Sequence, residues 1–77
     1  MKKIKILGTG CAKCEKLYDN TKIAAEEAGL DCEIIKIDDI QEIMKYGIMM
    51  TPGLVIDDRV VSFGKVLSTD EIKKHLI

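Results

Sequence analysis

Two cysteines separated by two residues, Cys11 and Cys14, constrain this chain more than any other feature. They follow residues 3–7, where charged and apolar side chains alternate before an apolar end, and they open a stretch with helical spacing over residues 12–28. A Cys-X-X-Cys pair at a helix start brings two sulfur atoms within bonding reach and keeps one at the surface. The fold must therefore place the end of a strand beside the start of a helix.

The helix predicted over residues 12–28 ends at Gly29 and orients the second cysteine. At 100° per residue, one stripe collects Cys14, Leu17, Tyr18, Thr21, Ala24, Ala25 and Ala28. We therefore expect Cys14 to face the interior. Ile23 lies on the opposite face, and we expect a single exposed apolar residue there rather than a partner contact, because such residues are common.

The middle of the chain predicts a second strand and a short helix. Residues 31–37 carry apolar side chains on both faces, as in a strand covered by helices on each side. Asp39 can cap a helix over residues 40–46, with Glu42 completing a capping-box-like arrangement and Gly47 ending the helix. We expect the buried face of this helix to comprise Ile40, Ile43 and Met44.

A hairpin and a last helix follow. Residues 53–56 and 60–63 predict two strands joined by a tight turn at residues 57–59. Residues 68–71 predict a capping box for a final helix. The apolar residues of that helix are Ile72, Leu76 and Ile77.

The predicted order is strand, helix, strand, helix, strand, strand, helix, or βαβαββα. A helical crossover makes the first two strands parallel, whereas the last two form an antiparallel hairpin. These constraints predict an α/β fold in which a four-stranded mixed sheet carries helices on both faces. Because 77 residues are too few for two independent cores, we expect one domain over residues 1–77.

Composition narrows the classes of partner. The net charge of −1 gives no electrostatic case for nucleic acid or an anionic membrane, and three aromatic residues offer no base-stacking platform. No apolar run approaches the ~20 residues of a transmembrane helix, and no secretory apolar segment is evident, which favours the cytoplasm. Three cysteines cannot form a closed disulfide framework, so the close pair is expected to be redox-active or metal-binding.

The position of the pair predicts unequal roles for its two sulfur atoms. Unpaired N–H groups and the positive end of the helix dipole favour the thiolate of Cys11, and Lys13 adds positive charge nearby, partly offset by Glu15. We assign Lys13 a pKa-tuning role on these grounds. Cys11 is then the nucleophile that attacks a disulfide, and Cys14 is the resolving thiol.

Residues 9–14 after a strand, the Thr51-Pro52-Gly53 step before the hairpin, and the element order over nearly all of the chain resemble the thioredoxin superfamily. The resemblance is strongest to small archaeal and bacterial thioredoxin-like or glutaredoxin-like proteins with a redox-active disulfide. It implies that Pro52 is in the cis form and lies against the cysteine pair. It also implies that the backbone of Thr51 pairs with substrate, so that both residues form a substrate-docking edge.

The resemblance implies a thiol–disulfide oxidoreductase acting on protein or small-molecule disulfides. No cofactor is expected, because the two cysteines carry the electrons themselves. An external reductase or thiol donor is expected to reduce the cysteine pair again after each exchange. We also expect a monomer. The chain departs from the family pattern in two places: it lacks the Trp and Gly-Pro of thioredoxin, and Ala12-Lys13 replaces the Pro-Tyr of glutaredoxin. Residues between the two cysteines tune the thiol pKa and the reduction potential.

Two other functions use the same cysteines. A ferredoxin-like carrier of soft metals such as Cu(I) or Zn also has Cys-X-X-Cys after its first strand, but its order is βαββαβ, which the helix predicted over residues 40–46 disfavours. Met49 and Met50 could supply thioether ligands for Cu(I), although such residues more often fill core gaps or form an adaptable docking surface. A redox-regulated interaction module is the third possibility.

Three further features are explained by structural roles and need no catalytic function. We expect Cys32 to be a small buried hydrophobe, because neither a base nor a second thiol is predicted beside it. His75 suits the carbonyl end of the last helix, and we assign it no catalytic role. Asp57 and Asp58 are explained by a hairpin tip.

Overall fold

A computed structural model describes residues 2–10 and 12–76. Its seven elements are β1 (Lys2–Leu7), α1 (Ala12–Ala28), β2 (Cys32–Ile37), α2 (Ile40–Met44), β3 (Gly53–Ile56), β4 (Arg59–Phe63) and α3 (Thr69–Leu76). The predicted order is confirmed, and it differs from the ferredoxin-like order because α2 separates β2 from β3. Among the described helices, none has the length and apolar character needed to cross a membrane.

The four strands form one mixed sheet in the order β2-β1-β3-β4. The central strand β1 runs parallel to β2, with Lys2 opposite Cys32 at one end and Leu7 opposite Ile37 at the other. On its other side β1 is antiparallel to β3, which forms the predicted hairpin with β4. The α/β mixed-sheet prediction is therefore confirmed.

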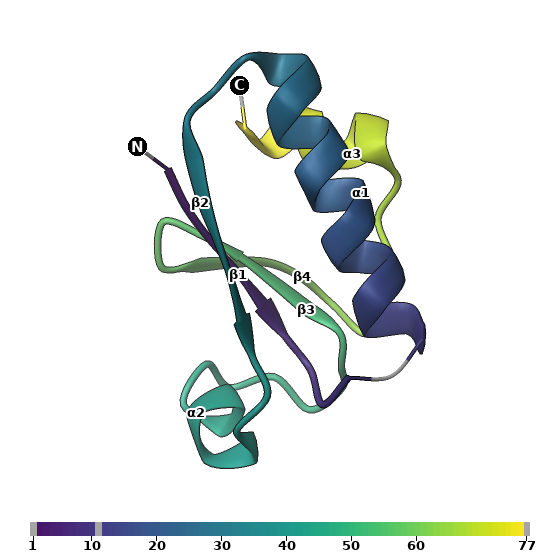
Figure 1. Cartoon of the computed structure of the whole chain (residues 1–77). Helices are drawn as coiled ribbons and strands as arrows, with labels where there is room; N and C mark the ends of the chain where they lie inside the picture. The colour runs from purple at the N-terminus through teal and green to yellow at the C-terminus, as the bar shows by residue number, and fades with distance from the viewer. Residues whose placement is uncertain (1, 11, 77) are drawn as a thin grey trace.

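Helices α1 and α3 lie side by side on one face of the sheet and enclose the main core (Figure 1). Alternate side chains of β1, Ile4 and Ile6, point into this core, as the pleat of a strand requires. The other buried members are Leu17, Ala24, Ala25, Leu54, Ile56, Leu67, Ile72 and Leu76. Each large side chain buried here stabilises the fold by roughly 1.5–3 kcal/mol.

A smaller cluster covers part of the opposite face. Its buried members are Leu7, Ile43, Ile48 and Val55. They come from β1, β3, α2 and the segment after α2, which lies at the end of the sheet where β1 and β2 finish (Figure 1). Helices thus lie on both faces, but the two layers are unequal in size.

The helix predicted over residues 40–46 is shorter than expected, and its predicted buried face is wrong in two of three residues. Ile43 is buried, whereas Ile40 is 61% and Met44 67% exposed. A helix of five residues makes little more than one turn, so it presents only one side to the sheet. Asp39 caps it through Gln41 N (2.9 Å), while the Glu42 carboxylate accepts from Lys45 Nζ (3.0 Å).

The second strand is less covered than predicted. Ile34, Ile35 and Ile37 are half-buried, because β2 is an edge strand with a neighbour on one side only. The capping box at α3 is confirmed by reciprocal bonds: Ser68 N donates to Glu71 Oε1 (3.1 Å), and Glu71 N donates to Ser68 Oγ (3.2 Å). Ile77 lies outside the described residues.

The predicted hairpin tip is confirmed. Asp57 and Asp58 adopt φ angles of 50° and 66°, which matches the two-residue turn that connects twisted antiparallel strands. Their carboxylates bind Lys2 Nζ and Lys5 Nζ, respectively, at 3.4 Å each. Structural roles therefore account for both carboxylates.

Candidate active site

The first cysteine of the pair, Cys11, lies outside the described residues, so its position at the surface stays a prediction. The residues before it are fixed by the end of the sheet: Gly8 N donates to Ile37 O at the end of β2 (2.9 Å). Gly10 has a φ of 86°, a left-handed conformation that glycine adopts without strain from a side chain. The chain thus turns sharply from β1 into α1.

Cys14 lies in the first turn of α1 and is 5% exposed, which confirms its predicted inward orientation. Its sulfur packs directly against the backbone of Gly8, since a Cβ added at Gly8 would overlap Cys14 Sγ. The same added Cβ would lie 4.0 Å from the Cβ of Thr51. The structure therefore brings Cys14, Gly8 and Thr51 together at the end of β1.

The Thr51–Pro52 peptide bond is cis, and the two residues differ in exposure. Pro52 is fully buried, whereas Thr51 is exposed. Pro52 O accepts a hydrogen bond from Gly64 N (2.8 Å), which ties the start of β3 to the end of β4. Thr51 is thus presented at the surface on a fixed backbone, next to the buried sulfur of Cys14.

A hollow of about 230 Å³ adjoins Cys14 on the other side. Its charged lining residues are Glu15, Lys36 and Asp38. Lys36 Nζ donates to both carboxylate oxygens of Glu15 (2.9 and 3.2 Å) and lies 4.3 Å from the centre of the Tyr18 ring. The hydrogen bond to Glu15 is the main cause that raises the pKa of Lys36, and burial acts in the opposite direction.

Sequence reasoning missed Lys36 as a neighbour of Cys14. The sequence does contain a signal for this position. Cys32 and Ile34 occupy alternate positions of β2 and face α1, so Lys36, two residues further on, lies on the same face of the strand. Lys13, by contrast, is exposed, and its predicted target Cys11 lies outside the described residues. The pKa-tuning role of Lys13 therefore stays a prediction.

An apolar rim surrounds Thr51. Met49 is 94%, Met44 67% and Met50 60% exposed, so these methionines do not fill gaps in the core. Together with Ile40 and Thr9 they line a shallow hollow of about 280 Å³. Exposed methionines make an adaptable apolar surface, because the side chain is flexible and polarizable.

The described residues include no cluster of metal-binding side chains. Within residues 2–10 and 12–76, no three His, Cys, Asp or Glu residues are grouped so as to hold a metal ion. Cys32 is half-buried at the start of β2, and burial is the main cause that raises the pKa of its thiol. A thiol that keeps its proton is a poor nucleophile, which agrees with the structural role expected for Cys32.

Comparisons with known proteins give a consistent family. A model described as "Thioredoxin domain" matches residues 2–77. A protein named "Thioredoxin" from Methanocaldococcus jannaschii is 48% identical over 73 residues, which is 95% of this chain and 84% of that protein. Another protein named "Thioredoxin", from Methanothermobacter thermautotrophicus, is 43% identical over 76 residues, covering 99% of both chains.

Proposed function

Because the chain belongs to the thioredoxin domain family, a family of thiol–disulfide oxidoreductases, we propose that its own disulfide exchange is carried by Cys11 and Cys14. The observation that carries this proposal is the position of Cys14. A buried sulfur one helical turn after Cys11, packed against Gly8 and near Thr51, is sheltered from large substrates yet close to its partner in sequence.

The proposed reaction has two exchange steps. The Cys11 thiolate attacks one sulfur of a substrate disulfide, which forms a mixed disulfide and releases the other substrate sulfur as a thiolate. The Cys14 thiolate then attacks the sulfur of Cys11, which forms the Cys11–Cys14 disulfide and releases the second substrate thiolate. Two electrons pass to the substrate, and both released thiolates take up protons.

The surface around Thr51 supports a docking role. Thr51 is exposed next to Cys14, while the buried Pro52 fixes the backbone behind it. In this proposal the backbone of Thr51 hydrogen-bonds to an extended segment of the substrate, and the methionine rim receives apolar side chains on either side. Lys13 stabilises the Cys11 thiolate by its charge.

The partners belong to the same proposal. Disulfide-containing proteins or small disulfides are the oxidants, and an external reductase or thiol donor returns the pair to the dithiol form. We place the protein in the cytoplasm, which rests on its composition and odd number of cysteines, and we expect it to be a monomer. No resident cofactor is required by this chemistry.

Stoichiometry with 5,5′-dithiobis(2-nitrobenzoate) tests the roles of the two cysteines. In a Cys32→Ala background, the reduced protein should release two nitrothiobenzoate ions, because Cys14 displaces the second ion from Cys11. Cys14→Ser should release one ion and retain the other as an adduct detectable by mass. Cys11→Ser should react slowly at the buried Cys14. An equally fast reaction of Cys11→Ser would contradict the assignment.

A further inference from the structure

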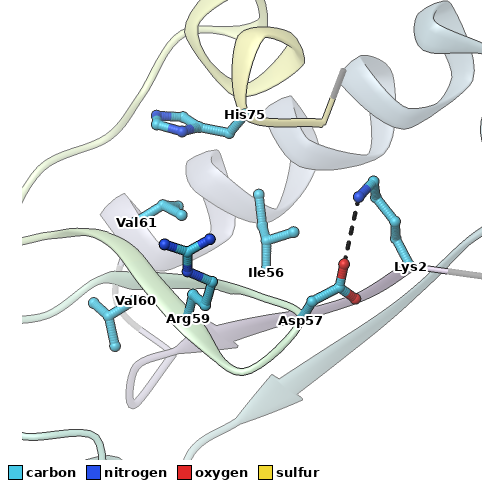
Figure 2. Close-up of a pocket in the computed structure, with 7 residues that line it drawn as sticks. All are labelled: Lys2, Ile56, Asp57, Arg59, Val60, Val61 and His75. Carbon is cyan, nitrogen blue, oxygen red and sulfur yellow. Dashed lines mark hydrogen bonds and ion pairs between the residues drawn. The ribbon is translucent and has the colours of Figure 1, made fainter.

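A third hollow, of about 440 Å³, lies at the end of the sheet away from Cys14. It is bounded by the start of β1, the β3–β4 hairpin and the last turn of α3 (Figure 2). Lys2 and Leu7 stand at the two ends of β1, so this hollow is about 17 Å from the strand end that leads to the cysteines. The proposed disulfide exchange makes no use of it.

Two cations and one imidazole line this hollow. The single arginine and the single histidine of the chain, Arg59 and His75, both line it together with Lys2. Figure 2 shows the guanidinium of Arg59 and the ammonium group of Lys2 pointing from the sheet toward the helix end that carries His75. In a chain with a net charge of −1, this is a local excess of positive charge.

The one carboxylate of the hollow is already engaged. Asp57 Oδ1 accepts from Lys3 N (3.1 Å), and Asp57 Oδ2 accepts from Lys2 Nζ (3.4 Å). The backbone bond from Lys3 is the main cause that lowers the pKa of Asp57, so this side chain stays ionised and held at one wall. The guanidinium of Arg59, by contrast, makes no hydrogen bond or ion pair with any residue that the structure describes.

The floor of the hollow is apolar. Ile56 is buried and Val61 half-buried beneath the charged rim. Small-molecule sites in proteins typically have volumes of about 300–1,000 Å³ and combine an apolar lining with a few polar groups. Both properties are present here.

We propose that this hollow binds a small organic phosphate, with the phosphate on Arg59 and His75 and an apolar body over Ile56 and Val61. The planar guanidinium can donate two parallel hydrogen bonds to a phosphate, which carries about −1.5 to −2 charge at neutral pH. Lys2 adds a second positive charge, although it is shared with Asp57. The proposal does not depend on the chemistry of Cys11 and Cys14.

Titration with phenyl phosphate, followed by backbone amide NMR of the full chain, tests the site. We expect saturable shifts in residues 56–61 and in the last turn of α3, and tighter binding than with inorganic phosphate or phenol. Arg59→Gln should weaken binding at least tenfold. Arg59→Lys should weaken it less, because lysine keeps the positive charge but cannot donate two parallel hydrogen bonds to the phosphate.

Lys16→Gln is the matched control, since it removes one positive charge from the exposed face of α1. Thermal unfolding of each variant shows whether the fold is intact; Arg59 is exposed, so we expect no change. Equal weakening in Lys16→Gln, or shifts spread over the lysines of the whole surface, would overturn the proposal. Binding of inorganic phosphate as tight as that of phenyl phosphate would contradict the role of the apolar floor.

Discussion

The two faces of the sheet are built differently. On one face, α1 and α3 enclose ten buried apolar residues, several of them fully inaccessible. On the other, the five-residue α2 and the segment after it enclose four. The first face supplies most of the buried area, and the second displays exposed methionines instead.

The candidate site lies where these two layers meet. Cys14 belongs to α1, one of the two helices over the larger core, and packs against Gly8, whereas Thr51 follows α2 on the thinner side. This division separates two requirements of disulfide exchange: a resolving sulfur in a fixed position and a surface that adapts to different substrates. Substitutions on each side test whether the two requirements are met by different parts of the molecule.

The two faces should differ most in how much a side-chain truncation lowers the free energy of unfolding. Leu17 is fully buried in the larger core, so Leu17→Ala should lower the free energy of unfolding by about 2–5 kcal/mol. Met44→Ala, on the thinner side, should change it by less than about 0.5 kcal/mol. Urea denaturation measures both. Similar losses of unfolding free energy in Leu17→Ala and Met44→Ala would contradict the claim that the larger core supplies most of the stability.

A substitution that disturbs the contact between Gly8 and Cys14 should destabilise the protein. Gly8→Ala places a methyl group where Cys14 Sγ lies, so we expect a loss of about 1–3 kcal/mol in unfolding free energy. The second step of exchange should slow as well, because the resolving sulfur is displaced. Stopped-flow release of the second nitrothiobenzoate ion measures that step.

A double-mutant cycle identifies the cause. In a Cys14→Ala background the sulfur is absent, so Gly8→Ala should be markedly less destabilising. If the cost is unchanged in this background, the strain does not come from Cys14.

The methionine rim should affect substrate binding and leave stability unchanged. Met49→Ser, at the most exposed methionine, should raise KM for a protein disulfide by about fivefold, corresponding to about 1 kcal/mol of lost apolar contact. The rate with a small disulfide should be unaffected. Ile23→Ser, an exposed apolar residue on the outer face of α1, is the control. An equal rise in KM in the control would remove the rim from the docking surface.

The smallest effect concerns the cap of α3. The hydrogen bond from Ser68 N is the main cause that lowers the pKa of Glu71 in the folded protein. Its contribution to stability is therefore present above the pKa of unfolded glutamate and is lost as pH falls through the lower folded pKa. Between about pH 6 and about pH 3, stability should fall less steeply in Glu71→Gln than in the unsubstituted protein. Glu26→Gln, on the exposed face of α1, should leave the slope unchanged.

The elements with strong local signals were predictable from the sequence. The alternation around Ile4 and Ile6, the capping box at Ser68 and the helical stripe that carries Cys14 each depend on neighbours along the chain. The exposure of Ile40 and Met44 was not predictable in this way. A helical stripe shows which residues share a face, but only the position of a short helix at the sheet edge decides which of them are covered.

The surroundings of Cys14 show the same limit. The pairing of Lys36 with Glu15 joins residues 21 positions apart, and the approach of Gly8 and Thr51 depends on how β1 and β3 are registered in the sheet. The hollow between Lys2, Arg59 and His75 combines three elements that are distant along the chain. Such groupings require the sheet order, which sequence patterns alone leave open.

A redox titration of the full chain shows whether Cys11 and Cys14 form one redox couple. The protein is equilibrated in dithiothreitol buffers of graded potential, and its thiols are trapped and counted by mass. Our account predicts one reversible two-electron transition that removes the thiols of Cys11 and Cys14 together while Cys32 remains a thiol. Separate loss of single thiols, or a transition that includes Cys32 and spares Cys14, would contradict it.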